Sequence, residues 1–187
     1  MSGEHANKEY SILQITLNLT GACLISGLII AATYFITAPI ATQKNAMLKE
    51  QAMKDLVVNA DSFKSVPKKA QWFAAEKKGK VIAYIVPSET KGYGGKIEML
   101  VAVSNNGKVI DYNILTANET PGLGSNASKD SFRDRFKGKK SEALKVVKDP
   151  SNKINIQAMT GATITSTAVT KGVKEAVDEV DEFVGGK

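Results

Sequence analysis

Residues 159–167 form the stretch whose residue types are best suited to holding a ligand. The stretch reads Met-Thr-Gly-Ala-Thr-Ile-Thr-Ser-Thr, with four Thr and one Ser among nine uncharged residues. Unpaired backbone N–H groups and the positive dipole end at the start of a helix favour a phosphate. The stretch therefore indicates either a phosphate site or simply a turn followed by a helix cap.

The residues that follow predict a helix from about Ser166 to Val184. Thr165 or Ser166 is its expected N-cap. The hydroxyl of Thr163 would then lie just outside the helix N-terminus, where the positive end of the helix dipole favours an anion. The apolar residues recur at helical spacing, with charged residues on the other faces: Val169, Val173, Ala176, Val177, Val180, Phe183 and Val184.

Two glycine-containing loops are further candidates for ligand contacts. Residues 91–96 read Lys-Gly-Tyr-Gly-Gly-Lys, and residues 119–124 read Glu-Thr-Pro-Gly-Leu-Gly. On chemistry alone each is a turn, because Pro-Gly favours type II and glycine allows positive φ. The functional alternative is that glycine lets backbone N–H groups approach a flat ring or a phosphate. Tyr93 could stack on such a ring or anchor its own loop.

The region around these loops predicts an α+β domain. Lys77-Lys78-Gly79 and Asn105-Asn106-Gly107 are hairpin signals between apolar runs. A mostly antiparallel sheet is therefore expected, with one face packed against helices. The four expected strands are residues 71–76, 81–86, 97–104 and 109–115; residues 59–69 are expected to be a loop, 128–136 a short helix and 144–147 a short segment.

A long uncharged window near the N-terminus predicts a membrane span. Residues 10–43 contain no charged side chain, and residues 17–36 are mostly apolar. About 20 such residues cross a bilayer as a helix. The alternatives are a cleaved signal peptide, which has a shorter apolar core, or a buried core helix. Gly21 and Gly27 suit close helix packing in a membrane.

The expected domain organisation has four parts. A polar tail covers residues 1–9, the transmembrane helix residues 10–38, a stalk helix and loop residues 39–69, and the globular domain residues 70–187. Pro39 either ends the span or opens the next helix, which is expected over residues 42–58 and could continue the first. Counting Lys and Arg would place the C-terminal part inside the cell, although this rule weakens for a long translocated domain.

Composition excludes several classes of function. The 187 residues include one Cys and one His, so no metal site can be built from Cys and His, and no Ser-His or Cys-His catalytic pair is expected. The net charge is +6, and its densest cluster, Lys137 to Lys140, is too short to suggest nucleic-acid binding. No Gly-x-Gly-x-x-Gly motif indicates a dinucleotide site. We therefore expect no catalytic residues, no metal and no nucleic acid.

Three motifs together resemble a known family. Thr-Gly-Ala-Thr at residues 160–163 resembles the flavinylation motif of the FMN-binding domain in Rnf G subunits and in the related C subunits of the sodium-pumping NADH:quinone reductase. The loops at residues 91–96 and 119–124 also look like loops of Rnf G subunits, and the order of elements agrees over nearly the whole chain. Gln157 stands where the fuller pattern has Asp.

The resemblance implies a covalent flavoprotein. FMN would be joined through its phosphate to Thr163. A separate flavin transferase would attach it, because a threonine hydroxyl is a poor nucleophile and no acid–base partner lies nearby in the sequence. The other cofactor-binding residues would come from all three motifs: Tyr93, Glu119, Thr120, Gly122, Leu123, Gly124, Thr160, Gly161 and Ala162.

The resemblance also implies a place in a membrane complex. An Rnf complex passes electrons between ferredoxin and NAD⁺ and couples the flow to Na⁺ or H⁺ transport; other membrane and iron–sulfur subunits would be partners. The flavin domain would lie outside the cell membrane. Two alternatives stay open: the C-type protein of the quinone reductase, which is usually longer, and a membrane-anchored ligand- or partner-binding module without flavin.

Overall fold

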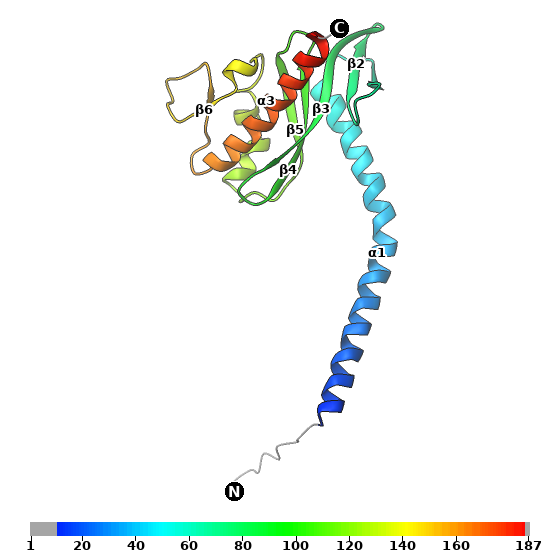
Figure 1. The fold of residues 1–187 in the computed structure, drawn as a ribbon. Helices are drawn as coiled ribbons and strands as arrows, with labels where there is room; N and C mark the ends of the chain where they lie inside the picture. Colours follow the sequence, from blue (N-terminus) through cyan, green and yellow to red (C-terminus); the bar gives the residue numbers. More distant parts are fainter. Residues whose placement is uncertain (1–10, 186–187) are drawn as a thin grey trace. The chain divides into compact units, whose positions relative to one another are not determined.

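The structure is a computed structural model that describes residues 11–185 (Figure 1). The chain divides into two compact units, Met1–Met47 and Leu48–Lys187. The first unit contains most of one helix, and the second contains all of the strands. The division by contacts falls inside the predicted stalk, and the four-part organisation predicted above remains a prediction.

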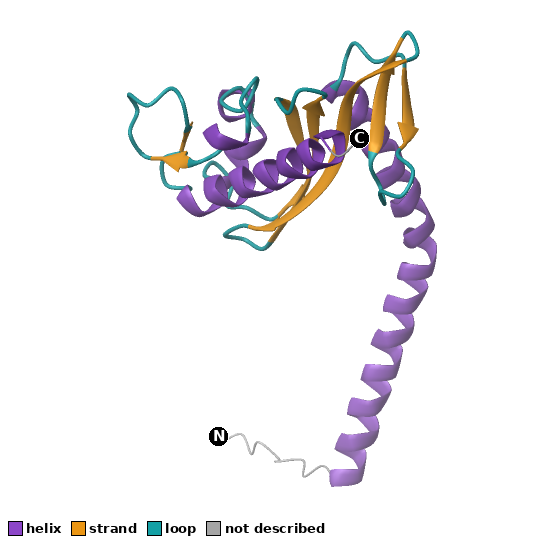
Figure 2. Ribbon diagram, turned by 45° about the horizontal axis from the view of Figure 1, so that its top comes forward, coloured by secondary structure: helices purple, strands orange, loops and turns teal. Residues whose placement is uncertain are grey.

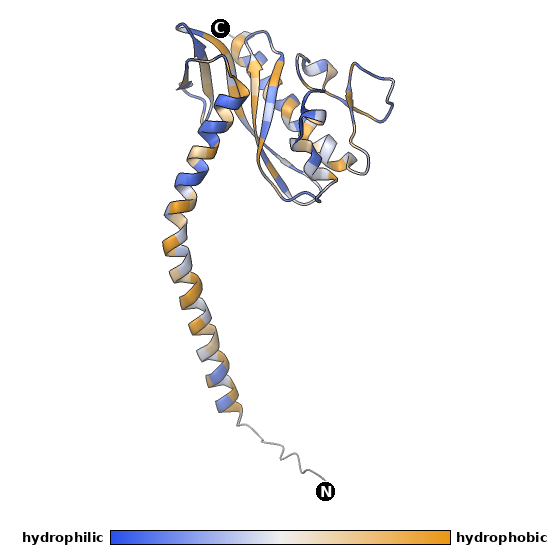
Figure 3. Cartoon of the chain, turned by 180° about the vertical axis from the view of Figure 1, so that it is seen from behind, coloured by the Kyte–Doolittle hydropathy of each residue, from blue (hydrophilic) through white to orange (hydrophobic). Residues whose placement is uncertain are grey.

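The first element is one continuous helix, α1 (Ile12–Leu56), which runs through Pro39. Pro39 therefore neither ends the span nor opens a new helix, and both alternatives for it are wrong. The helix expected over residues 42–58 instead continues the first one, although a proline inside a helix removes one backbone hydrogen bond. Among the described residues, α1 is the one helix long and apolar enough to cross a membrane, and none of its most apolar window is buried. The core-helix alternative is therefore wrong. Figure 3 shows apolar residues along the N-terminal part of α1 and polar ones toward its end.

The predicted antiparallel sheet is confirmed. Five strands lie side by side in sequence order, each antiparallel to the next. Figure 2 shows the sheet with helices packed against it. The strands are β1 (Ser62–Ser65), β2 (Phe73–Lys77), β3 (Lys80–Lys91), β4 (Lys96–Ser104) and β5 (Val109–Ala117).

The extra strand, β1, corrects the prediction of a loop over residues 59–69. Its four residues are too polar to be recognised as a strand, and they adopt one because β2 pairs with them from Ser62 opposite Glu76 to Ser65 opposite Phe73. The predicted hairpin at Lys78-Gly79 is present, with positive φ at both residues, as a tight primed turn requires.

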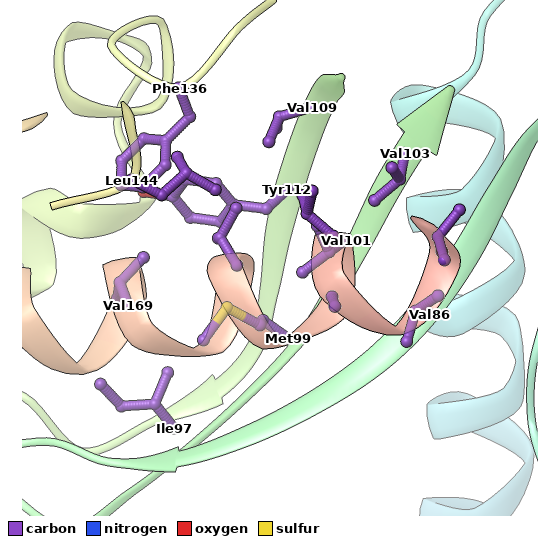
Figure 4. Packing of buried hydrophobic residues seen from close by; sticks show 14 of the residues in the cluster. Val86, Ile97, Met99, Val101, Val103, Val109, Tyr112, Phe136, Leu144 and Val169 are labelled. Atoms are coloured by element: carbon purple, nitrogen blue, oxygen red, sulfur yellow. The ribbon is translucent and has the colours of Figure 1, made fainter. Parts of the chain in front are cut away.

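Helices cover both faces of the sheet, whereas the sequence predicted cover on one. On one face lies α3 (Thr163–Gly185), whose apolar stripe packs on the central strands (Figure 4). On the other face the last turns of α1, at Ala52, Met53 and Leu56, pack on Ile85 of β3 and Leu100 of β4. Burial on both faces explains why β4 is apolar in an almost unbroken run rather than alternating.

The chain between β5 and α3 consists of short elements around a compact aromatic cluster. The predicted helix over residues 128–136 is much shorter, yet Phe132 and Phe136 still meet with ring centroids 5.3 Å apart. Tyr112 of β5 contacts Phe136 edge-to-face. The elements are η1 (Gly124–Ser128), α2 (Asp130–Arg133), η2 (Ser141–Ala143), β6 (Val146–Val147) and β7 (Ile156–Gln157), the last two paired in parallel.

Replacement of Tyr112 by Phe tests this cluster. The buried Tyr112 hydroxyl donates a 2.6 Å hydrogen bond to the Ala127 carbonyl, and burial raises the pKa of this phenol well above its ordinary value. Tyr112→Phe leaves that carbonyl unpaired and should lower the free energy of unfolding by about 1–2 kcal/mol. Thermal unfolding of the full-length protein in detergent measures the loss. Tyr93→Phe, at an exposed ring, is the matched control and should melt at the wild-type temperature. A melting temperature of Tyr112→Phe equal to that of the wild type would contradict the expectation.

Candidate functional site

The three motifs meet at one cavity of about 530 Å³ in the second unit. This volume is within the range of about 300–1,000 Å³ that is typical of ligand pockets. Of the ten residues predicted to bind a cofactor, eight line the cavity, whereas Thr160 and Gly122 lie in the same two loops but do not line it. The lining residues are Tyr93, Glu119, Thr120, Leu123, Gly124, Gly161, Ala162, Thr163, Ile164 and Thr165.

The start of α3 lies in the cavity wall. The helix begins at Thr163, three residues before the predicted start at Ser166, and its first α-helical hydrogen bond runs from Ser166 N–H to the Ala162 carbonyl at 2.9 Å. Thr163 is thus the first helical residue and is exposed, rather than a residue outside the helix. The first backbone N–H groups of the helix have no intrahelical acceptor and are available to an anion.

The predicted N-caps are wrong because both hydroxyls serve other bonds. Thr165 donates its hydroxyl hydrogen bond to Glu119. The Ser166 hydroxyl donates to the Ala162 carbonyl at 2.8 Å and accepts the Met159 N–H at 2.9 Å. Ser166 therefore ties the start of α3 back to the chain that precedes it.

The Thr-Gly-Ala-Thr motif is a tight turn that leads into the helix. The Ala162 N–H donates to the Met159 carbonyl at 3.1 Å, and Gly161, the third residue of this turn, has φ of 73°. A type II turn requires positive φ at that position, which glycine adopts without strain. The glycine of the motif therefore has a backbone role, and it presents the following threonine at the first position of α3.

Glu119 connects the three segments around the cavity. Its side chain is buried, with 9% exposed. One carboxylate oxygen accepts the Gly94 N–H at 3.0 Å, and the other accepts the Thr165 hydroxyl. The resulting junction joins the turn between β3 and β4, the loop after β5 and the first turn of α3.

The mouth of the cavity is apolar. Tyr93, Leu123 and Ile164 line it with 71%, 44% and 56% of their surfaces exposed. The sequence analysis did not select Ile164 or Thr165 as site residues. The sequence did contain an indication for Thr165. This residue lies one helical turn before Val169 and two turns before Val173, on the apolar stripe of α3, where a buried hydroxyl needs a hydrogen-bond partner.

Among the described residues, no Lys or Arg lines the cavity. A phosphate at Thr163 would therefore rely on backbone N–H groups and the helix dipole, with no cationic side chain from the lining. Glu119 is the one carboxylate in the described lining, and both of its oxygens already accept hydrogen bonds.

Comparison with known proteins agrees with this geometry. Residues 92–178, which include, in chain order, the second and third motifs and all of the first except Lys91, match the model of the FMN-binding domain. The fold resembles the crystal structure of Shewanella oneidensis NqrC, with a TM-score of 0.54, 21% identity and coverage of 70% of this chain and 73% of that one. It also resembles the C subunit of the Na⁺-translocating NADH-quinone reductase from Parabacteroides distasonis, with a TM-score of 0.51, 26% identity and coverage of 62% and 63%.

Relatives that match over most of this chain are named as subunits of a ferredoxin:NAD(+) oxidoreductase complex rather than of the NADH-quinone reductase. The chain is 63% identical to the G subunit of the proton-translocating ferredoxin:NAD(+) oxidoreductase complex of Clostridium ljungdahlii, over 95% of this chain and 96% of that protein. It is 30% identical to the G subunit of the Na(+)-translocating complex of Acetobacterium woodii, over 89% and 87%. With α1 as its apolar helix, the chain is a single-pass membrane protein that carries an FMN-binding domain. It belongs to the family of G subunits of the ion-translocating ferredoxin:NAD(+) oxidoreductase complexes, as the three motifs predicted.

Proposed function

We propose that Thr163 carries FMN as a phosphoester and that the chain is an electron relay between other subunits of a ferredoxin:NAD⁺ oxidoreductase complex. One observation supports this most directly: the exposed Thr163 is the first residue of α3 and lies in the wall of a cavity formed by all three motifs. Membership in the family of G subunits supplies the identity of the complex.

The phosphate end fits the start of α3. The N–H groups of Thr163, Ile164 and Thr165 lie in the first turn of α3 and have no acceptor within the helix. The helix dipole stabilises an anion beside them by about 0.3–1 kcal/mol. This stabilisation is small, and the described lining supplies no Lys or Arg to increase it. An unattached FMN would therefore have little to hold its phosphate, whereas an ester bond keeps the flavin in place whatever its affinity.

The apolar mouth fits the flavin ring. Tyr93, Leu123 and Ile164 offer one aromatic and two aliphatic side chains at the rim of the cavity. The loop from Thr120 to Gly124 also lines the cavity through Thr120 and Gly124, and the turn from Thr160 to Ala162 precedes the attachment residue. When bound, FMN supplies the redox chemistry, and the protein sets its position and surroundings.

Attachment requires a separate enzyme. In the part of the chain that the structure describes, no His, Lys or Arg lines the cavity, and the carboxylate of Glu119 already accepts two hydrogen bonds. None of these lining side chains is therefore placed to take the proton of the Thr163 hydroxyl. A flavin transferase would move the FMN phosphoryl group from FAD to the Thr163 oxygen. The pyrophosphate bond of FAD breaks, AMP leaves, and the hydroxyl proton is released.

The chain is a relay rather than a complete enzyme. Its cavity is shared by the three motifs of the flavin site, and the sequence offers no separate dinucleotide fingerprint. Electron donors and acceptors would be the iron–sulfur and membrane subunits of the complex. The flavin domain would lie on the extracytoplasmic side, with α1 as its anchor.

Covalent attachment predicts a mass change that depends on one hydroxyl. The full-length chain, coexpressed with a flavin transferase, should gain the mass of FMN less one water. Thr163→Ala should lose the added mass and the in-gel fluorescence completely, because no other group on the described wall replaces the ester and no cation there retains free FMN.

Thr167→Ala is the matched control. It removes an exposed hydroxyl one turn further along α3, bonded to the Thr163 carbonyl at 2.9 Å, and should be loaded normally. An unmodified wild-type chain, or a flavin retained by Thr163→Ala, would reject Thr163 as the attachment site. The first of these results would favour the flavin-free binding module.

The proposed side of the membrane is tested by labelling. Gly185 is exposed at the end of α3. In a Cys23→Ser background, Gly185→Cys should react in intact cells with a maleimide that cannot cross the membrane. Detergent-permeabilised cells give the total label. A label that forms only after permeabilisation would place the domain in the cytoplasm.

A further inference from the structure

We propose that Glu119 is a positioning residue, which holds the flavin-facing loops at a set distance from Thr163 without contacting the flavin through its carboxylate. Its effect on the flavin rests on the proposed function above, whereas its effect on the loops is a property of the chain itself. The inference depends on the connections, burial and surroundings of this one side chain.

The connections join all three walls of the cavity. Glu119 opens the loop that carries Leu123. Through one oxygen it accepts the N–H of Gly94, the neighbour of Tyr93, and through the other it accepts the hydroxyl of Thr165, two residues after Thr163. The rim residue on the turn between β3 and β4 and the proposed attachment residue on α3 are thus linked through a single carboxylate.

Burial makes these two hydrogen bonds important. The Glu119 side chain is 9% exposed, and neither of its two partners is a cation. A buried carboxylate without a cationic partner is kept by the hydrogen bonds that it accepts. Loss of either bond leaves a buried polar atom without its partner, so the two loops are held together rather than merely in contact.

Two glycines provide the space that the Glu119 carboxylate occupies, and a third lies against the backbone beside it. A Cβ atom at Gly92 would lie 2.3 Å from one carboxylate oxygen, and a Cβ atom at Gly124 would lie 2.6 Å from the other. At Gly94 a Cβ atom would lie 1.8 Å from the Asn118 carbonyl oxygen. Gly92 and Gly124 thus permit two backbone segments to approach the Glu119 side chain closely, and Gly94 permits its turn to approach the backbone of Asn118.

Attachment of the flavin and positioning of its ring depend on different residues. The ester at Thr163 requires its exposed hydroxyl and the turn before it, whereas Glu119 bonds to Gly94 and Thr165. The environment of the flavin ring requires the rim residues to keep their places relative to Thr163. A chain without the Glu119 junction should therefore still be flavinylated, but its flavin should lie in an altered and less ordered environment.

Two variants break the junction from opposite sides. Glu119→Ala removes both acceptors. Thr165→Val removes one donor while it keeps the size of the side chain and the carboxylate, so it remains informative if Glu119→Ala does not fold. Glu119→Gln is the rescue variant, because its amide oxygen can accept the Gly94 N–H and its NH₂ group can donate to the Thr165 oxygen. Thr170→Val is the control, since it deletes another buried α3 hydroxyl, which donates to the Ser166 carbonyl at 2.7 Å.

The first measurement needs no flavin. Hydrogen exchange of the Gly94 amide, read from peptides that cover residues 92–96 of the full-length chain in detergent, should be about tenfold faster in Glu119→Ala. It should be near the wild-type rate in Glu119→Gln and Thr170→Val. Thr165→Val should accelerate it less than Glu119→Ala does.

The second measurement uses the flavinylated protein. Glu119→Ala and Thr165→Val should keep the FMN mass but show a shifted flavin reduction potential and a weaker visible circular dichroism, and Glu119→Gln and Thr170→Val should resemble the wild type. The inference would be overturned if Glu119→Ala and Thr165→Val both kept the wild-type exchange rate of the Gly94 amide, the wild-type flavin potential and the wild-type circular dichroism. Equal changes in Thr170→Val would also overturn it, since they would reduce the effect to general destabilisation of α3. If the wild-type chain carries no flavin, the proposed function fails, and the exchange measurement still decides whether the junction exists.

Discussion

The buried carboxylate of Glu119 is the interaction on which the geometry of the cavity depends. It joins a turn, a loop and a helix that are separated by 25 and 46 residues along the chain. Because it is buried beside uncharged donors, both hydrogen bonds must be made for the carboxylate to be tolerated. Gly92 and Gly124 allow the backbone to approach this side chain closely, since a Cβ atom at either position would collide with the carboxylate.

The sheet supplies the rigid frame for that junction. Both faces of β3 and β4 are covered, by α3 on one side and by the end of α1 on the other. The stripe from Val169 to Val180 fixes α3 against the sheet, and this packing decides where its first residue, Thr163, is presented. The proposed attachment residue is therefore exposed, while the helix that carries it is anchored in the core.

The charge distribution around the cavity gives the proposed covalent attachment of FMN a physical reason. A flavin phosphate is commonly held by Lys or Arg as well as by a helix N-terminus. The described lining of this cavity offers the helix N-terminus without the cationic side chains. Such a site is suited to a cofactor that is attached once and retained, as the proposed relay requires, rather than to one that exchanges with solvent.

The sequence by itself determined the architecture and the composition of the site. Alternating and helical periods predicted four strands and α3, the uncharged window predicted the apolar helix, and the motifs selected eight of the residues that line the cavity. Tertiary structure decided what depends on contacts between distant residues. Ser62–Ser65 became a strand because β2 pairs with it, and α3 began at Thr163 because the hydroxyls of Thr165 and Ser166 bond elsewhere. Local patterns carry periodicity and turn chemistry, whereas the partner of a buried polar group is set only when the chain has folded.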